Sequence, residues 1–217
     1  MFSIDLRDHM SRIGDQGRRP TCVAFALTAC HEFHFRLLTR ELSKDSLHWG
    51  CVRRDGPATK GVSATTAIRV LELEGQHLEE AWPYRPDLDE VTWESLQPPD
   101  VDGQPVFKVS EVTKCEIKDP DSLHEHLRKS GPLFVIVPIW SSFFLIQDAR
   151  IPLPDEQVEE FRGYHAICIV GLTTRNHILI RNSWGITWGE SGYAIMPFEY
   201  ITKYGHSLHS IKITLER

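Results

Sequence analysis

The segment from Gln16 to Phe25 constrains the fold most, because a loop containing glycine and proline leads there into an apolar, helix-patterned segment with Cys22 at the junction. Thr21 is a residue type that opens helices by accepting a hydrogen bond from the first turn. From Val23 to Leu38, apolar residues recur at helical spacing. The pattern predicts a helix over residues 23–38, with Cys22 in its first turn.

The predicted place of Cys22 favours a reactive thiol. The first turn of a helix has unpaired amide donors and the positive end of the helix dipole, and both stabilise an anion. We therefore expect the pKa of Cys22 to lie below about 8.5, the usual value for a free thiol. Taken alone, a cysteine with apolar neighbours is more often a buried structural thiol. The interpretation thus depends on which other groups accompany it.

Acyl transfer by a thiolate also needs hydrogen-bond donors for the oxyanion and a proton carrier that is held in place. Gln16 precedes Cys22 across a loop that Gly17 and Pro20 allow to fold back. We expect its side-chain amide and the Cys22 backbone N–H to form an oxyanion hole. His165 starts a buried-looking strand and is the candidate for taking and returning the proton.

Two predicted strands, over residues 163–171 and 177–181, are separated by a turn at residues 173–176. The second strand runs directly into Asn182. If the strands pair as a hairpin, His165 and Asn182 lie near the same end, so the Asn182 carbonyl can orient the imidazole while an indole excludes water. Alone, His165 would more often be a core histidine and Asn182 a turn residue. Their order and spacing carry the prediction.

The motifs resemble those of papain-family cysteine peptidases. They comprise Gln16 with Cys22-Val23-Ala24-Phe25, then Tyr164-His165-Ala166, then Asn182-Ser183-Trp184-Gly185 followed by Trp188-Gly189-Glu190-Ser191-Gly192-Tyr193. The numbers of residues from Cys22 to His165 and from Cys22 to Asn182 are also close to those usual in the family. The resemblance implies four catalytic residues: Cys22, His165, Asn182 and Gln16.

The same resemblance implies an α+β, papain-like two-lobed fold. A helical lobe over roughly residues 15–100 would precede a lobe with an antiparallel β-sheet or barrel over roughly 101–217. The N-terminal segment 1–14 would cross onto the second lobe, and the active-site cleft would lie between the lobes. The chain would form a single peptidase domain over residues 1–217.

Substrate-binding residues follow from the resemblance in the same way. Gly61 and Val62 would border the subsites before the scissile bond, and Ile136 with Ala166 would contribute to the pocket that binds the side chain two residues before it. Because both are apolar, we expect an aliphatic or aromatic preference there. Tyr164 and Trp184 complete the predicted set, and residues 141–161 are expected to form an exposed loop on the side of the leaving group.

Hydrophobic periodicity predicts most of the remaining elements. A helix over residues 63–74 has Ser63 as its cap and Gly75 as its stop, and a second helix covers 122–129. The predicted strands cover residues 106–117, 133–139, 191–197 and 207–215.

Bulk properties exclude several function classes. The chain has 217 residues and a net charge of −6, from 24 basic and 30 acidic residues, without a clustered basic run. This composition argues against nucleic acid or an anionic membrane as the main partner. The proposed chemistry requires no cofactor. The segment Cys30–His34 lacks the spacing of H-E-x-x-H, so we expect no metal site.

The cysteine content indicates a reducing compartment. The chain has five cysteines, and Arg19 occupies the position three before the nucleophile where the family usually has a disulfide cysteine. Val23 also replaces the usual aromatic residue. With no signal peptide or inhibitory propeptide recognised at the N-terminus, these departures lead us to expect a bacterial-type, cytoplasmic enzyme. Arg18 and Arg19 either steer acidic substrates or form surface salt bridges.

Three alternatives to a peptidase that acts on protein or peptide substrates stay open. The same Cys-His-Asn chemistry serves toxin-like effectors, deamidases and transpeptidases. A non-catalytic binding module could retain the protease fold. An active enzyme could also be held idle until a regulatory partner or a neighbouring domain opens the cleft.

Overall fold

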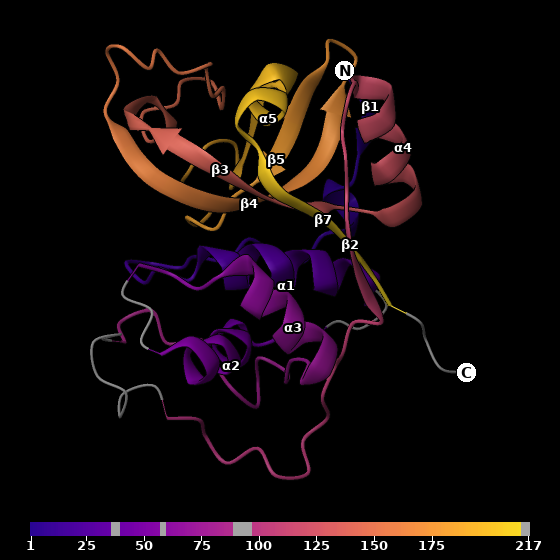
Figure 1. The fold of residues 1–217 in the computed structure, drawn as a ribbon, viewed down its shortest axis with the longest axis vertical. Coiled ribbons are helices and arrows are strands. Elements are labelled where there is room, and N and C mark those ends of the chain that lie inside the picture. The colour runs from indigo at the N-terminus through magenta and orange to yellow at the C-terminus, as the bar shows by residue number, and fades with distance from the viewer. Residues whose placement is uncertain (36–39, 57–59, 89–96, 214–217) are drawn as a thin grey trace.

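The computed structural model describes residues 1–35, 40–56, 60–88 and 97–213. The fold has a helical layer below a twisted antiparallel sheet (Figure 1). Three helices form the lower layer, and the first lies between the sheet and the other two. They are α1 (Cys22–His34), α2 (Lys44–Asp55) and α3 (Ala64–Leu73).

The sheet has the strand order β2-β7-β3-β4-β5-β6, with β1 paired to β4. Its strands are β1 (Phe2–Asp5), β2 (Glu111–Lys114), β3 (Leu133–Trp140), β4 (Phe161–Thr173), β5 (His177–Arg181), β6 (Tyr193–Pro197) and β7 (His206–Lys212). Further helices accompany the sheet: η1 (Arg7–His9), α4 (Pro120–Ser130), η3 (Ser141–Phe143) and α5 (Phe198–Tyr204). The N-terminal strand β1 thus joins the sheet rather than the helical layer.

Helix α1 is buried on nearly all sides, because the sheet covers one face and the other helices cover the opposite face (Figure 1). Leu27 and Cys30 are fully buried. A helix that is apolar around its whole circumference is expected in such a central position. The residues that precede and begin α1 are therefore held between the two layers.

The predicted hairpin is confirmed, since β4 and β5 pair antiparallel with Cys168 opposite Arg181. Its turn includes Asn176, whose φ of 57° lies in the left-handed region that asparagine tolerates. On the other side of β4, Val137 of β3 lies opposite His165. His165 is therefore held against β3, three residues before the stretch of β4 that also pairs with β5.

Several predicted bounds differ from the structure. The strand expected over residues 106–117 is limited to β2, because the Phe107 backbone instead exchanges two hydrogen bonds of 2.8 Å with Gln76 in the helical layer. Ser63 occupies the N-cap position of α3, but its side chain forms no capping hydrogen bond. Helix α1 ends at His34, with Phe35 in its C-cap position, and β7 ends at Lys212, so both elements are shorter than predicted. Residues 36–38 and 214–215 of these predictions lie outside the described ones. None of the helices in the described ranges combines the length and the apolar character needed to span a membrane.

Candidate active site

Cys22 is the first residue of α1, as predicted, but Thr21 does not cap the helix with its side chain. The Thr21 hydroxyl instead lies 2.8 Å from the Tyr84 hydroxyl, which belongs to a segment far along the chain. The prediction of a capping threonine was therefore wrong, because a tertiary partner takes the hydroxyl. The Thr21 carbonyl still accepts the first helical bond, from Phe25 N at 3.1 Å.

Gln16 links the loop before the helix to the residue next to Asn182. Its side-chain Oε1 accepts a hydrogen bond from Ser183 Oγ at 2.7 Å, and its backbone N–H donates to the Ser183 carbonyl at 2.8 Å. Its side-chain Nε2 donates one hydrogen to the Arg19 carbonyl at 2.8 Å. An amide nitrogen carries two hydrogens, and this bond uses one of them.

His165 and Asn182 form the contact that the hairpin predicts. His165 Nε2 lies 2.7 Å from Asn182 Oδ1, and that oxygen also accepts the Ser183 backbone N–H at 2.8 Å. The Ser183 backbone N–H can only donate, so it identifies Oδ1 as the amide oxygen, and a carbonyl oxygen only accepts. Nε2 therefore carries the hydrogen, and Nδ1 of the neutral ring has a lone pair available to receive a proton.

Aromatic rings cover this contact. The indole of Trp184 lies 4.7 Å from the His165 ring between centroids, and Phe143 lies 6.1 Å from it. Trp188 stacks on Phe143 at 5.7 Å. The predicted shielding indole is Trp184, while Phe143 of η3 was not found from the sequence because its segment shows no periodic pattern.

Burial keeps both reacting groups uncharged at neutral pH. Burial lowers the pKa of His165 to about 4, although the hydrogen bond to Asn182 partly opposes this shift. Burial raises the pKa of Cys22 above its ordinary value and outweighs backbone hydrogen bonds from Ala166, Val23 and Cys22 itself, which lower it. The backbone amides at the helix start thus lower the pKa of Cys22, as expected, but burial raises it by more. The prediction of a lowered Cys22 pKa is therefore wrong for the protein without a substrate.

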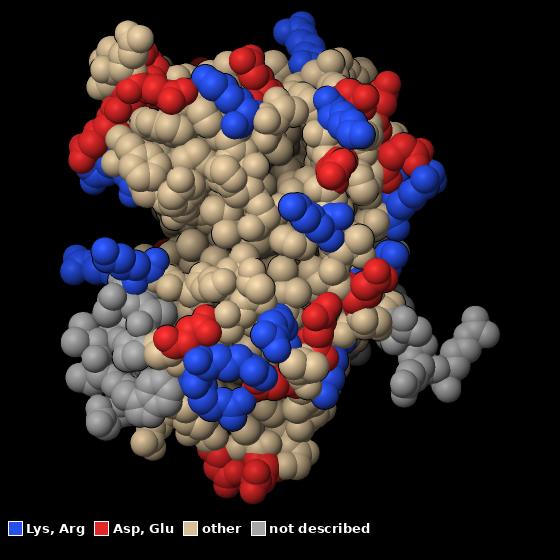
Figure 2. Space-filling view, in the orientation of Figure 1, with Lys and Arg blue, Asp and Glu red and all other residues tan. Residues whose placement is uncertain are grey.

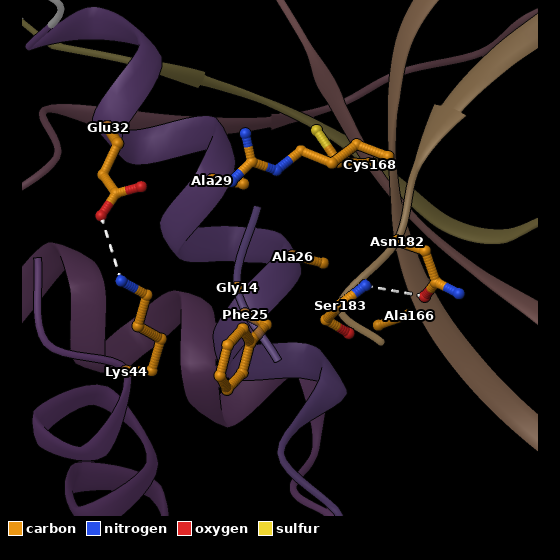
Figure 3. Close-up of a pocket in the computed structure, with 11 residues that line it drawn as sticks. Gly14, Phe25, Ala26, Ala29, Glu32, Lys44, Ala166, Cys168, Asn182 and Ser183 are labelled. Atoms are coloured by element: carbon orange, nitrogen blue, oxygen red, sulfur yellow. Dashed lines mark hydrogen bonds and ion pairs between the residues drawn. The ribbon is translucent and has the colours of Figure 1, made fainter. Parts of the chain in front are cut away.

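A small internal cavity of about 20 Å³ lies behind the site, between α1 and the ends of the strands (Figure 3). Phe25 and Ala26 of α1 approach Asn182 and Ser183 there. This volume is close to the space that one water molecule needs. The wall behind the candidate catalytic residues is therefore closely packed. On the face shown in Figure 2, the surface is hollowed between the two layers, and most of the side chains around this hollow are uncharged.

The predicted substrate-binding residues come from both layers. Gly61 has a φ of 97°, and a Cβ there would lie 3.2 Å from the Pro20 carbonyl, so the glycine allows close contact with the loop before Cys22. Half-buried Ile136 lies directly opposite Ala166 across β3 and β4. The other predicted positions differ in exposure: Val62 is half-buried, Tyr164 is 64% exposed and Trp184 is half-buried over the imidazole.

Arg19 is neither a surface residue nor a rim residue. It is 3% exposed, and its Nη1 lies 2.6 Å from Asp45 Oδ1 and 2.9 Å from the Arg85 carbonyl. Its guanidinium also lies over the Tyr84 ring at 4.8 Å. This buried ion pair connects the loop before Cys22 to α2. The pair could not be predicted from the sequence, because no residue near Asp45 indicates that Arg19 is its partner.

The side chains of the Cys30–His34 segment take separate partners. Cys30 Sγ lies 3.4 Å from Cys168 Sγ, His31 Nδ1 lies 2.8 Å from Gln76 Oε1, and Glu32 pairs with Lys44. In the part of the chain that the structure describes, no three His, Cys, Asp or Glu side chains converge as metal ligands would.

Comparison with known proteins decides the family, because residues 2–208 match the sequence model of the papain family cysteine proteases. The chain belongs to this papain family. Its fold is also similar to that of xylellain, a cysteine protease from Xylella fastidiosa, with a TM-score of 0.82 and 27% identity. That match covers 94% of this chain and 83% of xylellain, and it confirms the predicted papain-like α+β fold.

Among curated relatives, cathepsin K of Mus musculus is 24% identical over 202 residues, which cover 89% of this chain and 59% of cathepsin K. An uncharacterised peptidase C1-like protein of Acanthamoeba polyphaga mimivirus is 28% identical over 155 residues, which cover 65% of this chain and 48% of the viral protein. This papain-family chain therefore spans about half to three fifths of the length of these relatives.

Proposed function

We propose that this papain-family chain is a cysteine endopeptidase that hydrolyses peptide bonds through a thioester. The observation that carries the proposal is the 2.7 Å contact from His165 Nε2 to Asn182 Oδ1. It leaves Nδ1 available as a base in a site where Cys22 begins a helix. Cysteine provides the nucleophile, histidine the proton carrier and asparagine the orienting group.

In the proposed first step, Cys22 Sγ gives its proton to His165 Nδ1. Burial displaces each pKa away from the charged form, but one proton transfer creates both charges together, and their attraction offsets the desolvation. The thiolate then attacks the peptide carbonyl carbon. The Cys22 backbone N–H and the second Gln16 Nε2 hydrogen would stabilise the resulting oxyanion.

The collapse of this intermediate completes the cycle. His165 Nδ1 gives its proton to the leaving amine as the C–N bond breaks, which leaves a thioester on Cys22. Water then attacks the thioester while His165 takes one of its protons, and return of that proton to sulfur releases the acid and restores the thiol. No group outside the chain and water is needed to balance these steps.

Substrate selection before the scissile bond would depend on apolar contact. Ile136 and Ala166 lie opposite each other on neighbouring strands, so they would present an apolar surface to the side chain two residues before that bond. We propose an aliphatic or aromatic preference there, with Gly61 and Val62 along the same side of the cleft.

Labelling with an epoxysuccinyl peptide probe tests the proposal. We expect an adduct on Cys22, identified by mass spectrometry, that is lost in Cys22→Ala and strongly slowed in His165→Ala. The probe experiment is paired with cleavage of a peptide library, in which Cys22→Ala should abolish hydrolysis. Equal labelling of the buried cysteines Cys30, Cys51 and Cys168 would contradict an activated nucleophile.

The products distinguish the alternatives. Release of ammonia from glutamine side chains would identify a deamidase, and an amine adduct in place of a free acid would identify a transpeptidase. Absence of both labelling and turnover in the folded protein would favour a binding module. Turnover that appears only after a partner is added would identify a regulated enzyme.

A further inference from the structure

Two adjoining clefts form a groove on the sheet layer, away from Cys22. One has a volume of about 560 Å³ and the other about 510 Å³, and they share Arg150, His177 and Ile195. The first extends to Arg175 in the turn between β4 and β5. The second extends to Leu145, just after η3. We refer to both clefts together as the sheet groove.

The sheet groove begins beside the leaving-group side of the site. His165 would protonate the leaving amine, so the ring next to it, Trp184, marks this side. Trp184 stacks on Phe144 with centroids 4.9 Å apart, and the residue after Phe144, Leu145, lines the groove. A peptide that continues beyond the scissile bond past Trp184 would therefore approach the groove along Phe144 and Leu145, just after η3.

The groove carries cationic groups that have no counter-ion among the residues that the structure describes. Among the described residues, neither Arg150 nor Arg175 forms an ion pair, although many other exposed basic side chains do, for example Arg128 with Glu125. Asp148 is the one carboxylate among the residues that line the groove. In a chain with a net charge of −6, two unpaired arginines in one groove are available for an acidic ligand.

The backbone holds both arginines in place. Asp148 and Ala149 have φ values of 48° and 52°, a left-handed conformation that is unfavourable for a non-glycine residue. The turn places Arg150 against β6, because Ile195 N donates to the Ala149 carbonyl at 2.8 Å and Ile151 N donates to the Ile195 carbonyl at 2.9 Å. The strained turn thus fixes the backbone of Arg150, from which its side chain extends.

The other end of the groove is similarly anchored. Arg175 lies in the tight turn between β4 and β5, and its carbonyl accepts a hydrogen bond from His177 Nδ1 at 3.0 Å. The hydroxyls of Thr173 and Thr174 bond to the backbone of the chain itself. The guanidinium groups and the second nitrogen of His177 therefore remain for a ligand.

We propose that the sheet groove binds an acidic segment of the peptide substrate downstream of the scissile bond. This inference rests on the proposed function. The walls also contain apolar Phe2, Ile151 and Ile195, which suit a peptide of mixed acidic and apolar residues better than a uniformly charged polyanion. From His165 to Thr173, β4 spans roughly 26 Å, the length of about eight residues of extended peptide. The acidic residues should thus lie several positions after the cleaved bond.

Hydrolysis of two matched peptides tests the proposal. The peptides share their sequence through the scissile bond and differ in a downstream segment that is rich in either glutamate or glutamine. We expect kcat/KM to be about 10-fold higher for the glutamate peptide at low salt, since two charge-assisted contacts of about 0.7 kcal/mol each give that factor. The double variant Arg150→Gln with Arg175→Gln should remove the preference. A short peptide substrate whose leaving group is a small chromogenic amine has no downstream segment, and it should be cleaved equally by both proteins.

Arg128→Gln, on α4 and paired with Glu125, is the matched control and should retain the preference. Equal hydrolysis of the two long peptides by the wild-type protein would overturn the proposal. A preference that survives in the double variant would also overturn it, because the recognition would then lie outside the groove.

Direct binding separates this inference from the peptidase proposal. A fluorescein-labelled glutamate peptide is titrated into Cys22→Ala protein and followed by fluorescence anisotropy. Salt-sensitive binding that the double arginine variant weakens about 10-fold would support the groove even if the wild-type protein hydrolyses nothing. Binding of heparin at the same arginines, without binding of the peptide, would overturn the assignment in favour of a sulfated polysaccharide.

Discussion

The Arg19 guanidinium lies against the Asp45 carboxylate inside the protein, with Nη1 2.6 Å from Oδ1 and both side chains at most 3% exposed. Asp45 also accepts the Arg85 backbone N–H at 3.1 Å through its second oxygen. The Arg19 carbonyl in turn accepts a hydrogen bond from Gln16 Nε2. The ion pair therefore connects α2 to the proposed oxyanion loop, at a position where the family usually has a disulfide cysteine.

Removing one partner of this pair should destabilise the fold strongly. Asp45→Ala leaves a buried guanidinium without its counter-ion, and such a loss typically costs about 3–5 kcal/mol. Urea unfolding measures the change in the free energy of unfolding. Glu74→Gln, which removes the carboxylate that pairs with Arg53 and Arg54 at a more exposed position than Asp45, should cost about 1 kcal/mol or less. Similar losses in the two variants would contradict a special role for the buried pair.

Asn182→Ala should reduce turnover while leaving substrate binding largely unchanged. The side chain holds His165 through Nε2, and its loss would let the imidazole rotate while the base itself remains. We expect kcat to fall about 10–100-fold with little change in KM. Steady-state kinetics on a peptide substrate measures both constants. A rise in KM at constant kcat would instead indicate that Asn182 contacts the substrate.

Stability should decrease as the pH falls from about 6.5 to about 4. Burial lowers the pKa of His31 and of His165 to about 4 from an ordinary 6.5. In this window the unfolded chain binds a proton at each histidine that the folded chain does not bind, so acid favours unfolding. Together, the two histidines should lower the free energy of unfolding by about 2–3 kcal/mol for each unit by which the pH falls near pH 5.

Urea unfolding at several pH values measures this slope. In His31→Gln, the slope attributable to the two histidines should be about half as steep, whatever the stability of the variant at pH 7, because an amide does not titrate there. An unchanged slope would show that His31 titrates alike in the folded and unfolded chains.

Gly131→Ala should destabilise the protein more than Gly103→Ala. Both glycines have a positive φ, 77° and 74°, so an alanine strains the backbone at either position. At Gly131 the ψ of −154° lies in a region that is essentially restricted to glycine, which adds to the cost there. A Cβ at Gly131 would lie 2.4 Å from the Phe33 ring of α1, whereas nothing lies within 4 Å at Gly103. The clash should add about 1–3 kcal/mol. Thermal unfolding of the two variants compares them, and equal changes would show that Phe33 moves aside freely.

Much of the fold and of the candidate site could be predicted from local patterns. Apolar periodicity located the start of α1 at Cys22, and the turn residues between β4 and β5 identified a hairpin. A hairpin brings its open ends together by geometry alone, which is why His165 and Asn182 could be paired from the sequence. The family resemblance then predicted the arrangement in two layers, and the comparison with xylellain confirmed the fold.

Properties that depend on distant segments could not be predicted. The Thr21 hydroxyl bonds to Tyr84 instead of capping α1, and Phe107 pairs with Gln76 instead of extending β2. The pKa of Cys22 is raised rather than lowered. In each case a segment remote in sequence supplies either a competing partner or the desolvating surface, and local propensity contains no information about it.

The sequence by itself determined the order of the elements, the position of Cys22 at a helix start and the convergence of His165 with Asn182, because these depend on short-range periodicity and turn chemistry. Only the tertiary structure decided the charge state of the site and the burial of Arg19 against Asp45. It also placed two unpaired arginines in one groove. These features depend on which surfaces meet when the two layers pack, since desolvation and ion pairing are set by the distances between residues that are far apart in the chain.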